Sequence, residues 1–174
     1  MGRMHDGEFT ALCEREFPRI VGAMTLWCGD RGVAEEVTSE AFARAYRDWH
    51  RVRQLDVPGA WVRRVAMNLA RSTFRRRQAE WRANRRAHAG TVDRHRDPDS
   101  AAVVAVRDAL QRVSADHRTV LVLRHYLEMS VVEVAETMGR SPSAVTSLTH
   151  RAAAALADEL AAAPPAACPA GGLS

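Results

Sequence analysis

An arginine-rich segment with helical periodicity constrains the fold of this chain more than any other stretch of its sequence. Between Trp61 and Arg86 it contains nine arginines and only one acidic residue, Glu80. Apolar residues recur within it at positions i, i+3, i+4 and i+7, which are Val62, Val65, Ala66 and Leu69. This spacing predicts a helix with one apolar stripe that docks against a core.

The same segment predicts a second, polar face on that helix. At about 100° per residue, the residues that share this face are Arg64, Asn68, Arg71 and Arg75. Guanidinium groups remain charged and match phosphate, and an amide can hydrogen-bond a base edge. The face therefore favours a nucleic-acid surface, although a basic helix face that only meets solvent would show the same pattern.

The charge of the chain is concentrated around this segment. All 25 basic residues are arginine, and the formal net charge is only +4. Residues 61–96 carry eleven arginines and two acidic residues. In contrast, residues 1–60 carry eight arginines and ten acidic residues, and residues 101–160 carry six arginines and seven acidic residues. A positive block between two mildly acidic blocks is typical of a localised nucleic-acid footprint.

Length and composition predict a small protein without a cofactor or metal. A chain of 174 residues, of which 47% are hydrophobic and 6% aromatic, accommodates one or two small domains. The three cysteines lack metal-binding spacing, and their odd number argues against a disulfide framework. No apolar run approaches the roughly 18 residues of a membrane span, and no secretion signal is evident. We therefore expect a cytoplasmic protein that does not enter a membrane.

A catalytic role is not expected. The sequence contains no glycine-rich phosphate loop, no HExxH or GxSxG motif and no cluster of Asp, Glu and His. The chain is therefore predicted to act by binding rather than as an enzyme.

Two further helices are predicted before the arginine-rich segment. Apolar residues recur at helical spacing from Phe9 to Met24, where Pro18 indicates either a kinked helix or two short ones, and Gly29 ends the run. In the next helix, residues 32–49, the inner stripe consists of Val37, Ala41, Ala45 and Trp49. Its outer stripe, either an ordinary exposed face or a docking surface for a partner, consists of Glu36, Glu40, Ala43, Arg44 and Arg47.

A second helical domain follows a segment without periodicity. Residues 87–100 are predicted to form a flexible linker, and the low-complexity residues 161–174 a disordered tail. Between them Ser114 can cap a helix, and the predicted inward residues are Val103, Val106, Leu110, Val113, Val120, Leu123 and Leu127. The chain is therefore interpreted as all-α, with two small helical domains, residues 8–86 and 101–160, joined by the linker.

The second domain contains the pattern of a helix-turn-helix. Ser130 and Glu133 have capping-box spacing, Gly139 ends a short helix, and Ser141 with Pro142 begins the next. The inward residues of the two helices are Val131, Val134, Ala135, Met138, Val145, Leu148, Ala152 and Leu156. A plain helical hairpin shares this pattern, but a DNA-reading motif would place the second helix on DNA. Its outward residues are Ser143, Thr146, Ser147, His150 and Arg151.

Together these segments resemble an RNA polymerase sigma factor of the extracytoplasmic-function (ECF) type, in the sigma-70 family. Residues 34–46 (AEEVTSEAFARAY) resemble region 2.2 of that family. Residues 60–71 (AWVRRVAMNLAR), with the arginines at 75–77, resemble regions 2.3 and 2.4, and residues 110–156 resemble region 4. The order and spacing of the three segments are more specific than any one of them.

The resemblance implies a role for each segment. Region 2.2 binds the clamp helices of the largest subunit of core RNA polymerase, which implies contacts by Glu36, Ser39, Glu40, Arg44 and Arg47. Regions 2.3 and 2.4 open the −10 promoter element and hold its non-template strand, which implies contacts by Trp61, Arg64, Asn68, Arg71, Arg75 and Arg76. Region 4 reads the duplex −35 element, which implies contacts by Ser143, Thr146, Ser147, His150 and Arg151. Aromatic rings can stack on melted bases, and the candidates for such stacking are Trp61, Phe74 and Trp81.

The chain also departs from the family pattern. Ser39 stands where glutamine is common, Thr146 where a basic residue is common, and Leu148 where a polar residue is usual. The expected partners are core RNA polymerase and promoter DNA, both duplex and melted. Because factors of this type are often held by an anti-sigma protein, the resemblance also implies an anti-sigma protein as a partner. The alternative interpretation is a stand-alone helix-turn-helix regulator, which the scarcity of charge on the reading helix disfavours.

Overall fold

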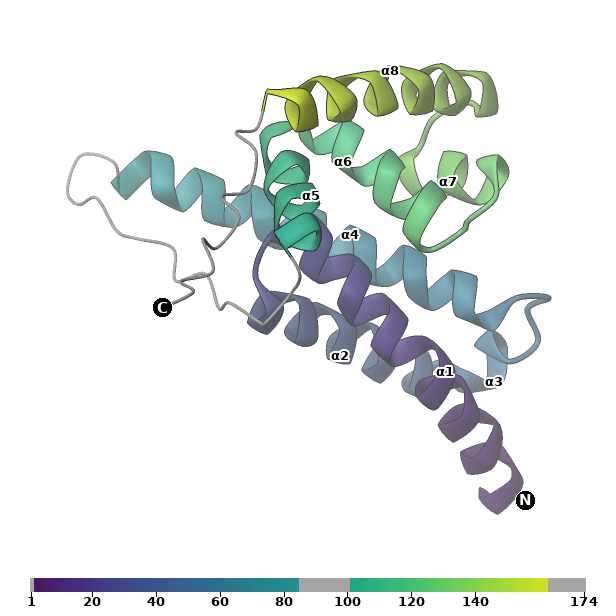
Figure 1. Cartoon of the computed structure of the whole chain (residues 1–174). Coiled ribbons are helices and arrows are strands. Elements are labelled where there is room, and N and C mark those ends of the chain that lie inside the picture. The colour runs from purple at the N-terminus through teal and green to yellow at the C-terminus, as the bar shows by residue number, and fades with distance from the viewer. Residues whose placement is uncertain (1, 85–100, 163–174) are drawn as a thin grey trace, which may run out of the picture.

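The computed structural model describes residues 2–84 and 101–162. Figure 1 shows its helices: α1 Gly2–Cys28, α2 Arg31–Arg47, α3 Trp49–Val52, α4 Pro58–Asn84, α5 Ala101–Arg112, α6 Ala115–Leu121, the π-helical turn η1 Val122–Tyr126, α7 Val131–Met138 and α8 Pro142–Ala161. No strand occurs within these two ranges, so the all-α prediction is confirmed. We call α1–α4 the N-terminal half and α5–α8 the C-terminal half. The predicted linker, residues 87–100, lies outside the described residues, as does the predicted tail 161–174 from residue 163 onward. The first residue of that predicted tail, Ala161, is instead the last residue of α8.

In the N-terminal half, α2 and α4 both pack against α1. Asp30 caps α2, because its Oδ1 accepts a hydrogen bond of 2.9 Å from the backbone N–H of Val33. The predicted inner stripe of residues 32–49 is buried in full, although α2 ends at Arg47 and Trp49 begins the short helix α3. Val62 and Ala66 from the predicted stripe of α4 are buried too. The helical periodicity of the sequence therefore identifies which faces of α2 and α4 meet the core.

The first helix, α1, continues through Pro18 as a single element. The two-helix alternative is therefore wrong, and α1 begins at Gly2, before Phe9 where the apolar periodicity starts. Gly29 follows its end with a φ of +74°, a left-handed conformation that glycine adopts without a steric penalty. The N–H of Gly29 donates to the carbonyl of Thr25 at 2.8 Å, which closes the last turn.

The predicted caps of the C-terminal half are all present. Ser114, Ser130 and Ser141 each accept a hydrogen bond from a backbone N–H three residues later. Both bonds of the Ser130–Glu133 capping box are formed, at 2.7 and 3.2 Å. These caps define where α6, α7 and α8 begin, and they were predictable because each involves residues close together in the sequence.

The turn between α7 and α8 depends on the left-handed backbone of Gly139, whose φ is +64°. No neighbouring atom would meet a side chain there, so only backbone strain opposes one. We expect Gly139→Ala to lower the free energy of unfolding by about 1 kcal/mol. Urea denaturation measures this change, with Gly7→Ala as the control, because Gly7 lies in α1 in open space. A Gly139→Ala variant as stable as Gly7→Ala would contradict the strain argument.

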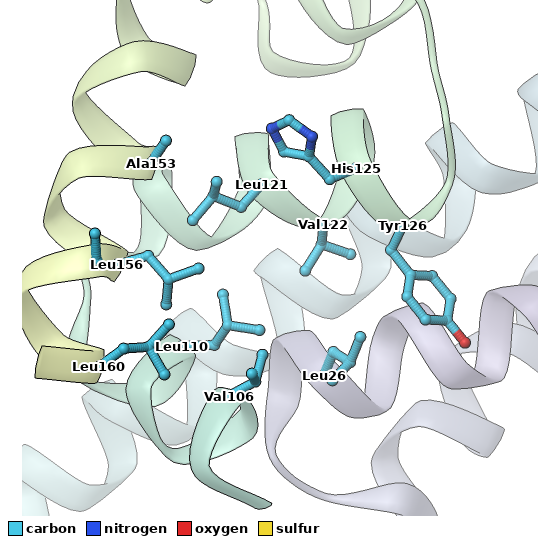
Figure 2. Close-up of a pocket in the computed structure, with 11 residues that line it drawn as sticks. Leu26, Val106, Leu110, Leu121, Val122, His125, Tyr126, Ala153, Leu156 and Leu160 are labelled. Atoms are coloured by element: carbon cyan, nitrogen blue, oxygen red, sulfur yellow. The ribbon is translucent and has the colours of Figure 1, made fainter. Parts of the chain in front are cut away.

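Two residues of the predicted α5 stripe are not in the core. Leu110 and Val113 are buried, but Val103 and Val106 are 41% and 39% exposed, so the inward prediction is wrong for this pair. Val106 lies at an apolar cavity of about 420 Å³ between the end of α1, α5, η1 and α8. Figure 2 shows Leu160 of α8 facing Val106 across this cavity. The periodicity of α5 therefore marks an apolar face, of which only the C-terminal part is covered.

One hydrophobic core extends through both halves. In Figure 1 the C-terminal half lies against one side of α1 and α4, with α5 and η1 contacting α1 and α7 contacting α4. Trp27 of α1 is 1% exposed, and its indole Nε1–H donates to Thr119 Oγ1 of α6 at 2.9 Å. The sequence predicts two domains joined by a linker; the structure adds that the two pack on each other.

Arg118 of α6 makes five hydrogen bonds while its side chain is almost fully buried, and one of the five reaches the N-terminal half. Nε donates to the carbonyl of Leu110 at 2.7 Å, and Nη1 donates to the carbonyl of Trp27 at 2.9 Å. The other bonds reach Gln111 Oε1 at 2.8 Å, Gln111 O at 2.9 Å and Val113 O at 3.3 Å. The carbonyls at the ends of α1 and α5 lack intrahelical partners and carry the negative end of each helix dipole. They stabilise the guanidinium charge without a carboxylate, although burial lowers the pKa of Arg118.

Residues 2–84 and 101–162 contain neither a membrane-spanning helix nor a metal-binding cluster. No helix there is long and apolar enough to cross a bilayer. Nor does that part of the chain bring together three or more His, Cys, Asp or Glu side chains that could hold a metal ion.

Candidate nucleic-acid interface

The polar face of α4 lies toward solvent, as the sequence predicts. Asn68, Arg75 and Arg76 are exposed, and the side chains of Arg64 and Arg71 are 40% and 33% exposed. Arg64, Asn68, Arg71 and Arg75 share one helix face, and Arg76, the residue after Arg75, lies beside that face. Side chains further along α4 lie outside the described part of the chain.

Arg63 differs from these arginines, because it is part of the packing between α1 and α4. Its side chain is 11% exposed, and Nε lies 3.4 Å from Glu16 Oε2. Its Nη1 donates to the carbonyl of Leu127 at 3.1 Å. Gly59 leaves room for this pair, since a Cβ there would lie 2.9 Å from the Glu16 carboxyl group. Sequence periodicity already left Arg63 off the polar face, but it could not identify the partners of Arg63, because they are distant along the chain.

Two arginines of the α4 face are paired with carboxylates of the C-terminal half. Arg64 Nη1 lies 3.5 Å from Glu136 Oε2 of α7. Arg71 Nη2 lies 3.8 Å from Asp116 Oδ1 of α6. The face is therefore partly neutralised in this arrangement of the two halves.

The three candidate stacking rings have different surroundings. Trp61 is half-buried and borders a cavity of about 350 Å³ between the start of α4 and α7. Phe74 is half-buried and packs edge-on against Trp27, with ring centroids 5.5 Å apart, so it contributes to the packing against the core. The side chain of Trp81 lies outside the described residues. Among the candidate rings whose side chains the structure describes, Trp61 is thus the one that borders an open cavity.

The outward face of α8 is open to solvent. All five predicted reading residues are exposed, namely Ser143, Thr146, Ser147, His150 and Arg151. Thr146 Oγ1 donates to the carbonyl of Pro142 at 3.1 Å, and Arg151 Nε donates to the carbonyl of Ser147 at 3.4 Å. The opposite face buries Val145, Leu148 and Ala152.

The outer stripe of α2 forms a third polar surface. Glu36, Ser39 and Arg47 are exposed, while Glu40 and Arg44 are partly covered. Glu40 Oε1 accepts a hydrogen bond of 2.8 Å from Arg44 Nε and lies 3.6 Å from Arg47 Nη2. The hydrogen bond from Arg44 lowers the pKa of Glu40. The stripe therefore presents an ordered set of opposite charges.

Comparison with known proteins decides the family. Sigma-70 region 2 matches residues 12–80, and Sigma-70, region 4 matches residues 104–156. The RNA polymerase sigma-E factor of Streptomyces coelicolor is 30% identical over 127 residues, covering 73% of this chain and 71% of that protein. The ECF RNA polymerase sigma factor SigL of Mycobacterium tuberculosis is 31% identical over 134 residues, which cover 74% of this chain and 75% of that protein. The chain belongs to the ECF group of the sigma-70 family.

A solved structure has the same fold as this sigma factor. The sigma factor RpoE, in complex with the anti-sigma factor NepR from Bartonella quintana, matches with a TM-score of 0.76 at 19% identity. The match covers 90% of this chain and 99% of that chain. Region 2 of this sigma factor thus lies in the N-terminal half and region 4 in the C-terminal half.

The buried face of α8 explains one departure of this sigma factor from the family pattern. Leu148 stands where a polar residue is usual, and it is only 5% exposed. It packs in the core with Val145 and Ala152. This position therefore anchors α8 in the core.

Proposed function

We propose that this sigma factor binds core RNA polymerase through α2, holds the opened −10 strand on α4 and reads the duplex −35 element with α8. The observation that carries this assignment is the presence of two exposed surfaces of different chemistry on the two halves. One is a row of guanidinium groups on α4, and the other is a mostly neutral face of hydroxyl and imidazole groups on α8. Such surfaces suit single-stranded and duplex DNA respectively.

The α4 surface has the groups that a melted strand requires. Proteins hold single strands by combining cationic grooves with aromatic rings on which bases stack. Arginines on α4 supply the charge, and Trp61 is placed to supply a ring beside Arg64. The exposed amide of Asn68 lies within this row and is available to a base edge.

The α8 surface is suited to reading rather than to tight binding. Of the five proposed reading residues, Arg151 alone carries a permanent charge, so the α8 surface can make few phosphate contacts. Two weak surfaces on one chain become effective when a large partner holds both near their targets. This requirement supports core RNA polymerase as the obligate partner.

The α2 surface is our proposed contact to the clamp helices of the largest polymerase subunit. Its residues are Glu36, Ser39, Glu40, Arg44 and Arg47. The hydrogen bond between Glu40 and Arg44 orders both side chains before binding. We place the chain in the cytoplasm beside the polymerase, in a regulatory rather than a catalytic role. We also propose regulation by an anti-sigma protein, the class of partner present in the RpoE–NepR complex.

Reconstituted transcription tests the proposed function. The full chain is added to bacterial core RNA polymerase with a pool of genomic DNA, and the transcripts are sequenced. We expect transcripts that start at a shared set of promoters and vanish when the chain is omitted. A control with α2 charges reversed, Glu40→Arg with Arg44→Glu, should lose polymerase binding in a pull-down. Core polymerase that remains active but yields no chain-dependent start sites would overturn the assignment.

The alternative, a stand-alone regulator, makes the opposite prediction for DNA binding. Such a protein should bind specific duplex DNA tightly without polymerase. An electrophoretic mobility shift with the free chain at physiological salt tests this point. We expect weak binding, because the five reading residues of α8 include a single permanent charge.

A further inference from the structure

Four large apolar side chains that remain exposed in the described part of the chain gather in one place. They come from three elements of the C-terminal half and are 36% to 43% exposed. Each of them lines one or both of two adjacent cavities. Apolar surface gathered in this way marks binding sites in soluble proteins. The four residues are Val103 and Val106 of α5, Tyr126 of η1 and Leu160 of α8.

The first cavity, which we call the apolar cavity, has a volume of about 420 Å³. Nine of its eleven lining residues are aliphatic, so an occupant gains most by placing hydrocarbon there. Figure 2 shows Leu110 of α5 facing Leu156 and Leu160 of α8 across it. This volume lies within the range of roughly 300 to 1,000 Å³ that small-molecule sites occupy.

The second cavity, which we call the cationic cavity, has a volume of about 480 Å³ and lies between α1, α2, α5 and η1. Its charged lining residues are Arg31, Glu35 and Arg107. Arg31 Nε lies 2.9 Å from Glu35 Oε1, so these two charges offset each other and Arg107 supplies the excess positive charge. Arg107 is half-buried. Because a guanidinium has five N–H donors, Arg107 can bind a carboxylate in addition to its contacts within the chain.

Tyr126 lies where the two cavities meet. It lines both of them, as does Leu26 of α1. A Cβ on Gly22 would overlap the tyrosine hydroxyl and lie 3.1 Å from Cζ, so glycine lets the ring lie against α1, toward which the hydroxyl points in Figure 2. The ring belongs to η1, whose π-type bond runs from the N–H of Leu127 to the carbonyl of Val122 at 3.0 Å. Turns of this kind are frequent at functional sites. A ligand that extends along Tyr126 therefore reaches both cavities.

We propose that the two cavities together bind a fatty carboxylate, with its alkyl chain in the apolar cavity and its carboxylate on Arg107. Burial of the chain supplies affinity, about fourfold for each methylene. The charge-assisted bond to the guanidinium fixes the orientation of the ligand. None of the residues that we assign to polymerase or DNA contacts lines either cavity, so this inference does not depend on those assignments.

Calorimetric titration of the full chain with laurate, below its critical micelle concentration, tests the proposal. We expect one laurate to bind per chain. Decanoate, which is shorter by two methylenes, should bind about fifteenfold more weakly. Dodecyltrimethylammonium has the same alkyl chain with a cationic head, which Arg107 repels, and should bind at least about tenfold more weakly than laurate. The absence of saturable laurate binding, or equal affinity for the two head groups, would overturn the proposal.

A substitution that fills the apolar cavity should remove laurate binding. Val106 is 39% exposed, so Val106→Trp extends into the cavity without disturbing the core. We expect the Kd for laurate to rise at least about tenfold, since the alkyl chain loses its buried surface. Val132→Trp is the matched control, because Val132 is exposed on α7 and lines neither cavity, and its Kd should change by less than about twofold. Equal Kd values for the two variants would place laurate elsewhere and reject the site.

The role of Arg107 is tested with two ligands that differ only in charge. Arg107→Gln should weaken laurate binding about tenfold and leave the binding of dodecanol unchanged, since the alcohol head carries no charge. Retained dodecanol binding also shows that the variant is folded. Arg51→Gln is the control, because Arg51 is exposed on α3 and lines neither cavity, and laurate affinity should stay within about twofold. An equal loss for laurate and dodecanol would contradict the carboxylate contact.

Other occupants of this apolar surface would give different results. A membrane contact would make the chain sediment with phosphatidylglycerol vesicles, and a contact with a second copy would make it a dimer in size-exclusion chromatography with light scattering. We expect a monomer that remains in the supernatant. Vesicle binding or dimerisation that Val106→Trp abolishes would assign the surface to that occupant and reject the fatty-carboxylate site.

Discussion

Promoter-dependent transcription should fall about a hundredfold when Arg71 and Arg75 are both replaced by alanine. Both arginines lie on the outward face of α4, and neither contributes to the buried stripe. Each charge-assisted contact is worth about 1.5 kcal/mol or more, so the loss of two corresponds to about a hundredfold. Run-off transcription from a promoter identified with the wild-type chain measures the change.

One further template and one control variant make this prediction more specific. A template with a pre-melted −10 region should recover part of the lost activity, because opening no longer depends on the arginines. Arg31→Ala/Arg112→Ala removes the same charge from ion pairs on α2 and between α5 and α8, and should retain activity within about twofold. Full activity of the Arg71→Ala/Arg75→Ala variant on duplex DNA would refute the role of the α4 row.

The largest loss of stability is expected from Arg118→Met. The substitution removes the Arg118 donors from carbonyls at the ends of α1 and α5, in a site that is nearly closed to water, and Trp27 O keeps only a longer bond of 3.4 Å from Gln111 Nε2. Removing one side of a buried charged network costs about 3 to 5 kcal/mol, whereas an exposed ion pair contributes about 1 kcal/mol or less. Urea denaturation followed by helical circular dichroism should show this loss of unfolding free energy.

Two controls belong to this measurement. Arg112→Met removes an arginine from an exposed pair with Glu159 and should cost about 1 kcal/mol or less. Arg118→Lys keeps the charge but replaces the planar fork by one ammonium, so its stability should fall between wild type and Arg118→Met. A loss below about 1 kcal/mol for Arg118→Met would contradict its role as a joint between the halves.

The parts of this fold that depend on nearby residues were predictable from the sequence. The Ser130–Glu133 box and the Gly139 turn place α7 and α8 correctly, since their bonds connect residues at most five positions apart. The exposed faces of α4 and α8 followed from the same periodicity. The proposed contacts of these faces with DNA stay predictions.

Contacts between distant residues were not predictable from periodicity. Arg118 and Trp27 are 91 positions apart, and no local pattern connects them. The apolar face of α5 was identified, but whether Val103 and Val106 are covered depends on how α8 and α1 are placed around it. The packing of Phe74 could not be predicted for the same reason, because its neighbour Trp27 belongs to another helix.

The shared core has a consequence for exchanging parts between relatives. A hybrid that joined residues 2–84 of this chain to the C-terminal half of another sigma factor would bring in a foreign residue at position 118. Without an arginine there, the carbonyl of Trp27 at the end of α1 would lose its 2.9 Å donor. Compatibility between the two parents of such a chimera is therefore decided at the joint between the halves as well as at the surfaces that meet DNA.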